Sequence, residues 1–221
     1  MIPLRDTEPS LSRPLITGCL IGVNILVFLY EYSLDPFSLN WLFSHYGLVP
    51  ARFQFLDLIT SMFLHGGWMH LIGNMWFLWI YGDNIEDILG RNKFLLFYLL
   101  CGIAAGLVQT LVSGGSRIPT VGASGAIAGV MGGYLVKFPR AKILTLVPIF
   151  VFVTTMEIPA VFILLYWFVI QFFSGIGNLG QVNETGGVAF FAHIGGFLAG
   201  MILIYIMGSG PRYSKRQEYN W

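Results

Sequence analysis

Apolar residues form long runs along this chain, and the polar and charged residues gather in shorter segments between the runs. A helix that crosses the hydrocarbon core of a bilayer needs about 20 consecutive, predominantly apolar residues. Five runs suggest such helices, and a sixth begins at a proline, which is accepted in the first turn of a helix but disfavoured in its interior. The predicted spans are Leu15–Tyr30, Trp68–Tyr81, Phe94–Val112, Ala123–Val136, Pro159–Phe173 and Val188–Met207. The pattern therefore predicts an all-α, polytopic membrane protein with six transmembrane helices.

Two of these runs and one further apolar segment depart from the ideal length. Trp68–Tyr81 and Ala123–Val136 are short, so each either draws on flanking residues or begins below the membrane surface. The segment Ile143–Val153 covers only about half a span and contains Pro148. We therefore expect this segment to be interfacial or re-entrant rather than a seventh crossing helix.

The basic residues test the number of crossings, because cytoplasmic loops carry an excess of Lys and Arg. With six spans and the N-terminus inside, the outside segments carry only Arg52 and Arg117 of the chain's 12 Lys and Arg residues. A seventh span at 143–153 would move the basic residues of the C-terminal tail outside and weaken this bias. We therefore expect both termini to be cytoplasmic. We also expect no cleavable signal peptide, because no small-x-small site follows the first apolar run before Glu31.

The overall composition agrees with a membrane protein and narrows the classes of function. Of the 221 residues, 56% are hydrophobic and 10% are charged, whereas soluble domains carry roughly 25% charged residues. The length suits one compact domain over residues 1–221. A net charge of +1 gives no reason to expect a nucleic-acid partner. Cys19 and Cys101 both lie in apolar runs, where a free cysteine behaves as a small hydrophobe, so we infer no disulfide.

Four polar residues in the predicted spans carry the candidate chemistry. Polar and ionisable side chains inside a span are costly, and they mark functional sites. Under the six-span topology the second, fourth and sixth spans all run from outside to inside. His70 and Asn74, Ser124, and His193 then lie at one depth towards the outer face, although they are far apart in sequence. His70 and Asn74 are four residues apart and therefore share one helical face.

Glycines repeat at helical spacing beside these residues. The two small-xxx-small stripes are Gly125, Gly129 and Gly133 in the fourth span and Gly196 and Gly200 in the sixth. Such stripes let two helices approach closely. We therefore expect the fourth and sixth spans to bring the Ser124 hydroxyl within hydrogen-bond reach of a His193 ring nitrogen.

These residue types predict hydrolysis by a serine nucleophile. A serine hydroxyl is a weak nucleophile until a base removes its proton, and histidine is the usual base because it titrates near working pH. The tetrahedral intermediate needs hydrogen-bond donors directed at its oxyanion. The candidate donors are the backbone N–H of Ser124, the Asn74 amide and the His70 imidazole. No carboxylate lies at this depth to orient His193, so we predict a Ser124–His193 dyad rather than a triad.

Three other functions use polar groups inside a membrane. An intramembrane metalloprotease could draw on His65, His70 and His193, but it requires a His-Glu-x-x-His motif, which HGGWMH does not match. An aspartyl intramembrane protease requires two aspartates in the spans, and the predicted spans contain none. A transporter would agree with the short segments, but the sequence has no inverted repeat to support it. We therefore predict no bound metal and no cofactor.

At these residues the chain resembles the rhomboid family of intramembrane serine proteases. The matching elements are Gly122-Ala123-Ser124-Gly125, Ala192-His193 with Gly196, the segment FLHGGWMHLIGN with His65, His70 and Asn74, and Glu86, Gly90 and Phe94 in the following loop pattern. The resemblance implies a minimal, six-span bacterial rhomboid in the inner membrane, with its active site towards the outer face. It also implies cleavage of single-pass membrane proteins near the outer ends of their spans.

The resemblance further assigns roles to individual residues. Ser124 and His193 are implied as the catalytic dyad, and His70, Asn74 and Ser124 as the oxyanion hole. Apart from the resemblance, we assign helix packing at the site to the glycines Gly122, Gly125, Gly129 and Gly196, because small residues let helices approach closely. The physiological substrate and the oligomeric state stay open.

Two positions depart from the family pattern. Leu56-Asp57 stand where many members carry Trp-Arg in the first outer loop, and Ala128 stands one turn after the nucleophile, where some members stack a tyrosine on the base. We therefore expect other packing to orient His193. An inactive, rhomboid-like membrane chaperone is the remaining alternative, and the presence of all four polar site residues argues against it.

The outer segment 175–187, GIGNLGQVNETGG, links the fifth and sixth predicted spans and contains five glycines. Glycine-rich backbone has little to hold it in one conformation, and active-site lids are drawn from segments of low stability. We predict that this segment is a mobile cap over Ser124, with the fifth span as a lateral gate.

Overall fold

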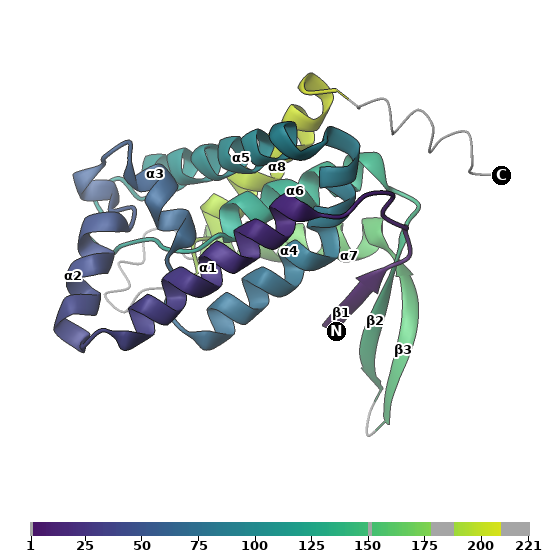
Figure 1. The fold of residues 1–221 in the computed structure, drawn as a ribbon, viewed down its shortest axis with the longest axis horizontal. Helices are drawn as coiled ribbons and strands as arrows, with labels where there is room; N and C mark the ends of the chain where they lie inside the picture. Colours follow the sequence, from purple (N-terminus) through teal and green to yellow (C-terminus); the bar gives the residue numbers. More distant parts are fainter. Residues whose placement is uncertain (1, 150–151, 178–187, 209–221) are drawn as a thin grey trace.

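The computed structural model describes residues 2–149, 152–177 and 188–208. Most of the predicted cap, residues 178–187, lies outside the described residues. Helices dominate the fold (Figure 1). The α-helices are α1 (Leu15–Ser33), α2 (Pro36–Tyr46), α3 (Asp57–Thr60), α4 (Trp68–Leu89), α5 (Arg91–Val112), α6 (Ser124–Lys137), α7 (Ala160–Gly177) and α8 (Phe190–Ile206).

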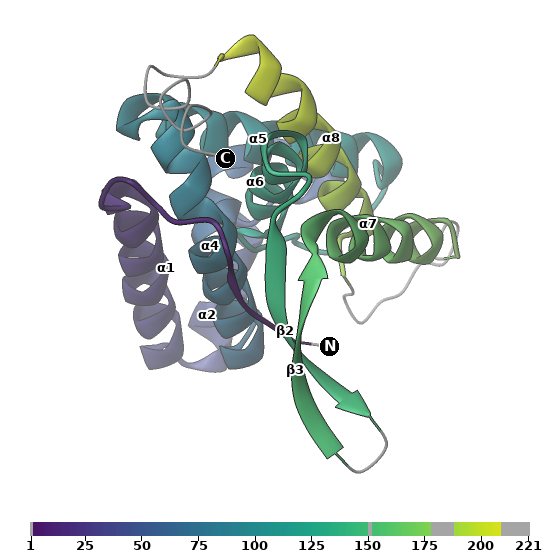
Figure 2. The same cartoon turned by 90° about the vertical axis from the view of Figure 1, so that its right-hand side faces the viewer.

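Helix α6 is the centre of the bundle and packs against α4, α5 and α8 (Figure 2). Every residue from Gly125 to Leu135 is buried. A helix covered by protein on all sides is apolar all round, and the α6 sequence SGAIAGVMGGYLVK has this character. Its 14 residues are few for a complete span, and the residues just before Ser124 are not helical. Helix α4, in contrast, gains length at its C-terminal end, where it continues to Leu89.

Three helices, α1, α5 and α7, are long and apolar enough to cross a membrane. Helix α8 is apolar but shorter, with 17 residues. Helix α4 carries Asp83, Glu86 and Asp87 in its C-terminal part. The six predicted spans correspond to α1, α4, α5, α6, α7 and α8. The described part of the chain is therefore mostly helical and contains three clear candidate spans, and the crossing of all six helices stays a prediction.

The prediction of an all-α fold is wrong in one respect, because the chain also forms a three-stranded antiparallel sheet. Its strands are β1 (Ile2–Asp6), β2 (Lys142–Ile149) and β3 (Phe152–Pro159), in the order β1-β2-β3. The segment Ile143–Val153, expected to be interfacial or re-entrant, supplies β2 and the start of β3. The segment is rich in β-branched residues, which favour strands, but its partner β1 lies at the other end of the chain. Hydrophobicity alone therefore could not identify the pairing.

Side chains of the bundle hold β1 in place. The Asp6 carboxylate accepts hydrogen bonds from the Tyr134 hydroxyl at 2.6 Å and from the Asn84 amide at 2.7 Å. The Trp76 indole N–H donates to the backbone carbonyl of Pro3 at 2.6 Å. The strands run across one end of the bundle beside α4 and α7, and the β2–β3 hairpin extends past the helices (Figure 2).

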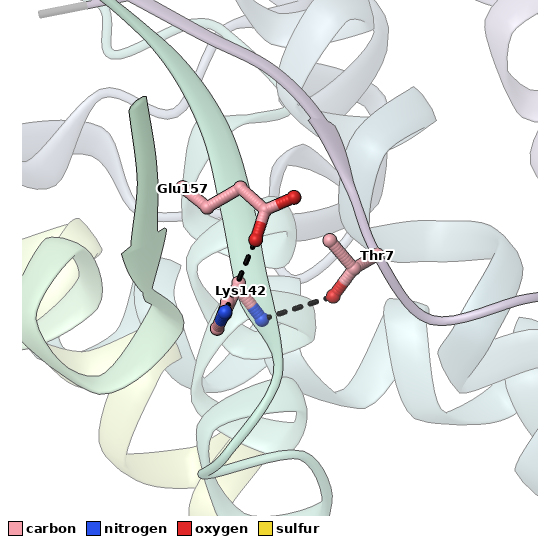
Figure 3. Close-up of polar contacts among 3 residues, drawn as sticks. All are labelled: Thr7, Lys142 and Glu157. Carbon is pink, nitrogen blue, oxygen red and sulfur yellow. Dashed lines mark hydrogen bonds and ion pairs between the residues drawn. The ribbon is translucent and has the colours of Figure 1, made fainter. Parts of the chain in front are cut away.

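Polar contacts at the start of β2 join it to its neighbours (Figure 3). The Lys142 ammonium lies 3.1 Å from the Glu157 carboxylate on β3, and the Lys142 backbone N–H donates to the Thr7 hydroxyl at 3.2 Å. Both side chains of the ion pair are about half exposed. Exposed ion pairs contribute about 0–1 kcal/mol, so the backbone ladder and the contacts with the bundle hold the sheet.

A buried carboxylate joins the first helix to α4. Glu86 accepts hydrogen bonds from the backbone N–H groups of Ile16 and Thr17, at 3.0 and 2.8 Å, and from the Thr17 hydroxyl at 2.9 Å. The first N–H groups of a helix have no partner within the helix, and Glu86 supplies one for α1. The sequence pattern placed Glu86, Gly90 and Phe94 in a loop, but Glu86 lies within α4. Gly90 forms the junction to α5, with φ of 77°, and Phe94 is a fully buried residue of α5.

Candidate active site

The loop before Ser124 is held from both sides. The backbone groups of Leu48 and Thr120 exchange two hydrogen bonds at 3.0 and 2.8 Å, and the Gly122 N–H donates to the Ser61 carbonyl at 2.9 Å. Gly122 adopts φ of +125°, in the region that favours glycine. The chain then turns directly into α6, so that Ser124 is the first residue of the helix. The segment between α2 and α4 and this turn together position the Ser124 hydroxyl.

Helix α8 places His193 against Ser124. The His193 Nε2 atom lies 2.8 Å from the Ser124 Oγ atom, which is hydrogen-bond distance. His193 is buried, with 8% of its surface exposed, whereas Ser124 is half-buried. The two residues therefore form a hydrogen-bonded pair in which Ser124 is more accessible than His193.

Glycines explain how α6 and α8 come this close. A Cβ atom on Gly196 would overlap the Gly125 carbonyl oxygen, and one on Gly200 would overlap the Gly129 carbonyl oxygen. The two helices therefore meet backbone against backbone. Gly129 also faces α5, because a Cβ atom there would overlap the Cys101 side chain. The stripe on α6 thus serves contacts with two neighbouring helices.

The Gly196 contact leads to a prediction about the site. Replacing Gly196 by valine should push α8 away from α6 and move His193, which lies three residues earlier on the same helix. A misplacement of about 1 Å can cost about 100-fold in rate, so we expect at least this loss together with a lower melting temperature. The hydrolytic activity expected from the sequence and the thermal unfolding of the protein, both measured in one detergent, test these two effects.

Gly18→Val is the matched control, because Gly18 is exposed on α1 and a Cβ atom there would have no neighbour within 4 Å. We expect this variant to behave as the wild type. Wild-type activity and stability in Gly196→Val would show that the α6–α8 contact tolerates a side chain and does not set the position of His193.

Two side chains of α7, which the prediction of a dyad did not include, contact His193 on its other side. The Gln171 Oε1 atom lies 2.7 Å from the His193 Nδ1 atom. The Trp167 ring lies 5.5 Å from the imidazole, centroid to centroid, at an angle of 38°. The sequence could have indicated Gln171 as a site residue, because it is the only amide or charged side chain in the apolar sequence of α7.

His70 and Asn74 lie beside the turn that carries Ser124. A Cβ atom on Gly122 would lie 2.6 Å from the His70 Nε2 atom and 3.6 Å from the Asn74 Nδ2 atom. The Gly66 N–H donates to His70 Nδ1 at 3.3 Å, so the ring proton is on Nε2, which faces Gly122. The buried Nδ2 of Asn74 has no hydrogen-bond partner among the described residues. Buried polar groups rarely lack a partner, and here two N–H donors are available close to the serine.

His65 lies next to this group but its ring makes no hydrogen bond within the described residues. Its backbone N–H donates to the Glu31 carboxylate, with both oxygens at 3.2 Å. Its ring lies 5.1 Å from the His70 ring at an angle of 63°. His65 thus packs against His70 from the non-helical segment just before α4. Among the described residues it forms no hydrogen bond with Ser124 or His193.

The segment between α2 and α4 contains Leu56-Asp57, which depart from the pattern of the family that the sequence resembles. Leu56 is exposed, whereas Asp57 begins α3 and is almost completely buried. Burial raises the pKa of the Asp57 carboxyl above its ordinary value, and the positive charge of Arg52 partly opposes this. This segment therefore packs a carboxyl group at the position where that family pattern has an arginine.

Comparisons with known proteins show to which family the chain belongs. The sequence profile of the rhomboid domain matches residues 52–210. Rhomboid-like protein 11, chloroplastic, from Arabidopsis thaliana is 29% identical over 203 residues, which cover 90% of this chain and 68% of the relative. RHOMBOID-like protein 6, mitochondrial, from Arabidopsis thaliana is 34% identical over 155 residues, covering 70% of this chain and 44% of the relative.

A fungal protein is also similar. Rhomboid protein 1, mitochondrial, from Saccharomyces cerevisiae is 33% identical over 135 residues, which cover 58% of this chain and 38% of the relative. The chain thus spans less than half the length of two of these three relatives. The matched region includes Ser124, His193, His70 and Asn74 and covers most of the helical bundle, and on this evidence the chain belongs to the rhomboid family.

Proposed function

We propose that this protein is an intramembrane serine endopeptidase that cleaves single-pass transmembrane proteins near the outer ends of their spans. The observation that carries this proposal is the 2.8 Å contact between Ser124 Oγ and His193 Nε2. A serine becomes a competent nucleophile when an adjacent base accepts its proton. Membership of the rhomboid family supports the same chemistry.

In the proposed reaction the Ser124 oxygen attacks the carbonyl carbon of the substrate peptide bond while its proton moves to His193 Nε2. The carbonyl oxygen becomes an oxyanion, and its donors are the Ser124 backbone N–H, His70 Nε2–H and the Asn74 amide. His193 then gives the proton to the leaving amine, and an acyl-enzyme remains on Ser124. Water, activated by the same histidine, hydrolyses this ester and regenerates the hydroxyl.

The unpartnered Asn74 amide supports the oxyanion assignment. Donors that stabilise an oxyanion act best when they are fixed in place before the charge develops. Asn74 is 7% exposed, and its Nδ2 atom has no partner among the described residues. A buried donor with no partner in the resting protein can form its bond when the oxyanion appears, without first breaking another bond.

The proposed topology has six spans in a single membrane domain over residues 1–221, with both termini in the cytoplasm. The N-terminal ends of α4, α6 and α8 then lie towards the outer face, and the four polar site residues lie in the first two turns of these helices. We place the protein in a bacterial inner membrane, following the resemblance to minimal six-span members. Its partners are the lipid bilayer and its transmembrane substrates.

A reconstituted cleavage assay tests this function. The purified protein in liposomes should cut a single-pass substrate whose span has small, helix-destabilising residues at its outer end. A matched span with leucines at those positions is the comparison, and mass spectrometry locates the cut. We expect one cut near the outer end of the first span and a much slower cut in the second. No cleavage of either span, together with no labelling of Ser124 by a fluorophosphonate, would identify an inactive member of the family.

A further inference from the structure

Helix α7 contacts the imidazole of His193 through two residues one turn apart. Trp167 and Gln171 are four residues apart, so they lie on the same face of the helix, and this face meets α8. The other face is exposed, with 66% of Phe162 and 58% of Tyr166 accessible. The only amide side chain of this helix is therefore directed towards the proposed base, away from the exposed face of the helix.

The partner of Gln171 determines which tautomer of His193 is present. An amide oxygen accepts hydrogen bonds and cannot donate them. The 2.7 Å contact between Gln171 Oε1 and His193 Nδ1 therefore requires a proton on Nδ1. A neutral imidazole with its proton on Nδ1 has a lone pair on Nε2, and Nε2 is the atom that faces the Ser124 hydroxyl.

The opposite tautomer would not support the reaction. With the proton on Nε2, the nitrogen beside Ser124 would be a donor and could not accept the serine proton. In hydrolases with a Ser-His-Asp triad, the carboxylate holds the histidine in the useful tautomer and orientation. Among the described residues no carboxylate forms a hydrogen bond with His193, and Gln171 occupies the corresponding position on Nδ1.

We propose that Gln171 is the positioning residue for the base: it fixes His193 in the Nδ1–H tautomer and directs Nε2 at Ser124, while Trp167 holds the plane of the ring. The site is then a dyad in its chemistry and a hydrogen-bonded chain of three residues, Gln171, His193 and Ser124, in its geometry. This inference rests on the proposed peptidase function. Because Gln171 lies on α7, the base is oriented only while α7 is packed against α8.

Two substitutions separate the acceptor from the volume of the side chain. Gln171→Met has a similar size without an amide oxygen, and Gln171→Glu has the same length with oxygens that accept. Removing the partner that orients a metal-bound histidine costs about 10- to 100-fold, and we expect a loss of this size in kcat for Gln171→Met, with little change in KM. Gln171→Glu should recover activity to within a few-fold of the wild type.

Fluorophosphonate labelling of Ser124 provides a second measurement that needs no transmembrane substrate. Its rate should fall in Gln171→Met by the same factor as kcat, because both depend on activation of the same hydroxyl. Val169→Met places the same new residue at an exposed position of α7, and this control should retain wild-type rates and melting temperature.

The tautomer itself can be observed. In protein with 15N-labelled histidine, the signals of His193 are assigned by their absence in His193→Ala. Wild type and Gln171→Glu should show the Nδ1–H form, and Gln171→Met should show a mixture of tautomers. If Gln171 only filled space, Gln171→Met would show the same Nδ1–H form as the wild type.

The outcomes distinguish this inference from the proposed function. If Gln171→Met keeps wild-type kcat, labelling rate and tautomer while Ser124→Ala loses cleavage, the positioning role is wrong and the peptidase function stands. If Gln171→Glu loses as much activity as Gln171→Met and both have lower melting temperatures, the residue serves packing only, and the inference is again rejected. If wild-type protein neither cleaves nor reacts with the fluorophosphonate, the proposed function fails first.

Discussion

Replacing Ser124 by alanine should reduce peptide-bond cleavage to background, and replacing His193 by alanine should have the same effect. Nucleophile and base act as one unit, so the loss of either costs about as much as the loss of both, on the order of 10⁴- to 10⁶-fold in kcat. The contact of 2.8 Å between their side chains is the structural basis of this expectation. Cleavage of a reconstituted single-pass substrate by each purified variant measures the effect.

Folding must be separated from chemistry in this experiment. Ser33→Ala and His45→Ala remove the same side chains at exposed positions of α1 and α2, and both should retain wild-type activity. All four variants should elute as the wild type does in detergent, and only wild type and the two controls should react with a fluorophosphonate. Substantial turnover by folded Ser124→Ala or His193→Ala would reject the dyad.

Removing both oxyanion donors of α4 is expected to have the second largest effect. The loss of one such donor typically costs about 100- to 1,000-fold in kcat, so we expect a loss of up to this size in Asn74→Ala and in His70→Ala. The loss is smaller if the remaining donors compensate. The double variant should lose more than either single variant. Because these donors act on the developing charge, kcat should fall while KM changes little. Steady-state kinetics on one substrate gives both constants.

A second buried asparagine controls for stability. Asn24 lies in α1, is fully buried, and donates to the Leu20 carbonyl at 2.7 Å. Asn24→Ala should lower the melting temperature without changing kcat of the folded protein, whereas Asn74→Ala should change kcat. Normal kinetics in the Asn74→Ala, His70→Ala double variant would show that neither side chain stabilises an oxyanion.

Several features of the fold could be predicted because they depend on residues close together in the sequence. Runs of apolar residues predict the positions of α1, α5 and α7 well, since each is long enough to cross a bilayer by itself. The first glycines of the two stripes, Gly125 and Gly196, predicted the approach of α6 and α8. A residue without a side chain marks a close contact whichever helix faces it.

The site was predictable for a related reason. Polar residues in apolar helices are costly, so the sequence itself draws attention to Ser124 and His193. If alternate helices run in the same direction, their starting ends lie at one end of the bundle. The structure brings these two side chains into hydrogen-bond contact and places His70 and Asn74 beside the Ser124 turn.

The sheet and the environment of His193 were not predictable in the same way. Strand β1 at residues 2–6 pairs with β2 at residues 142–149, and no local pattern records so distant a partner. Gln171 and Trp167 were visible as residues of an apolar helix, but their contact with His193 depends on which face of α7 meets α8.

The sequence by itself therefore determined where six of the helices form, which polar side chains they carry, and where two backbones can meet closely, whereas it did not predict α2 and α3. These properties follow from the residue types, their periodicity and the cost of polar groups in an apolar environment. Only the tertiary structure decided that β1 joins the β2–β3 hairpin, that Glu86 holds the start of α1, and that Gln171 accepts from His193 Nδ1. Each of these contacts consists of directional hydrogen bonds between distant segments. Such bonds form only when packing has fixed the faces and depths of both partners.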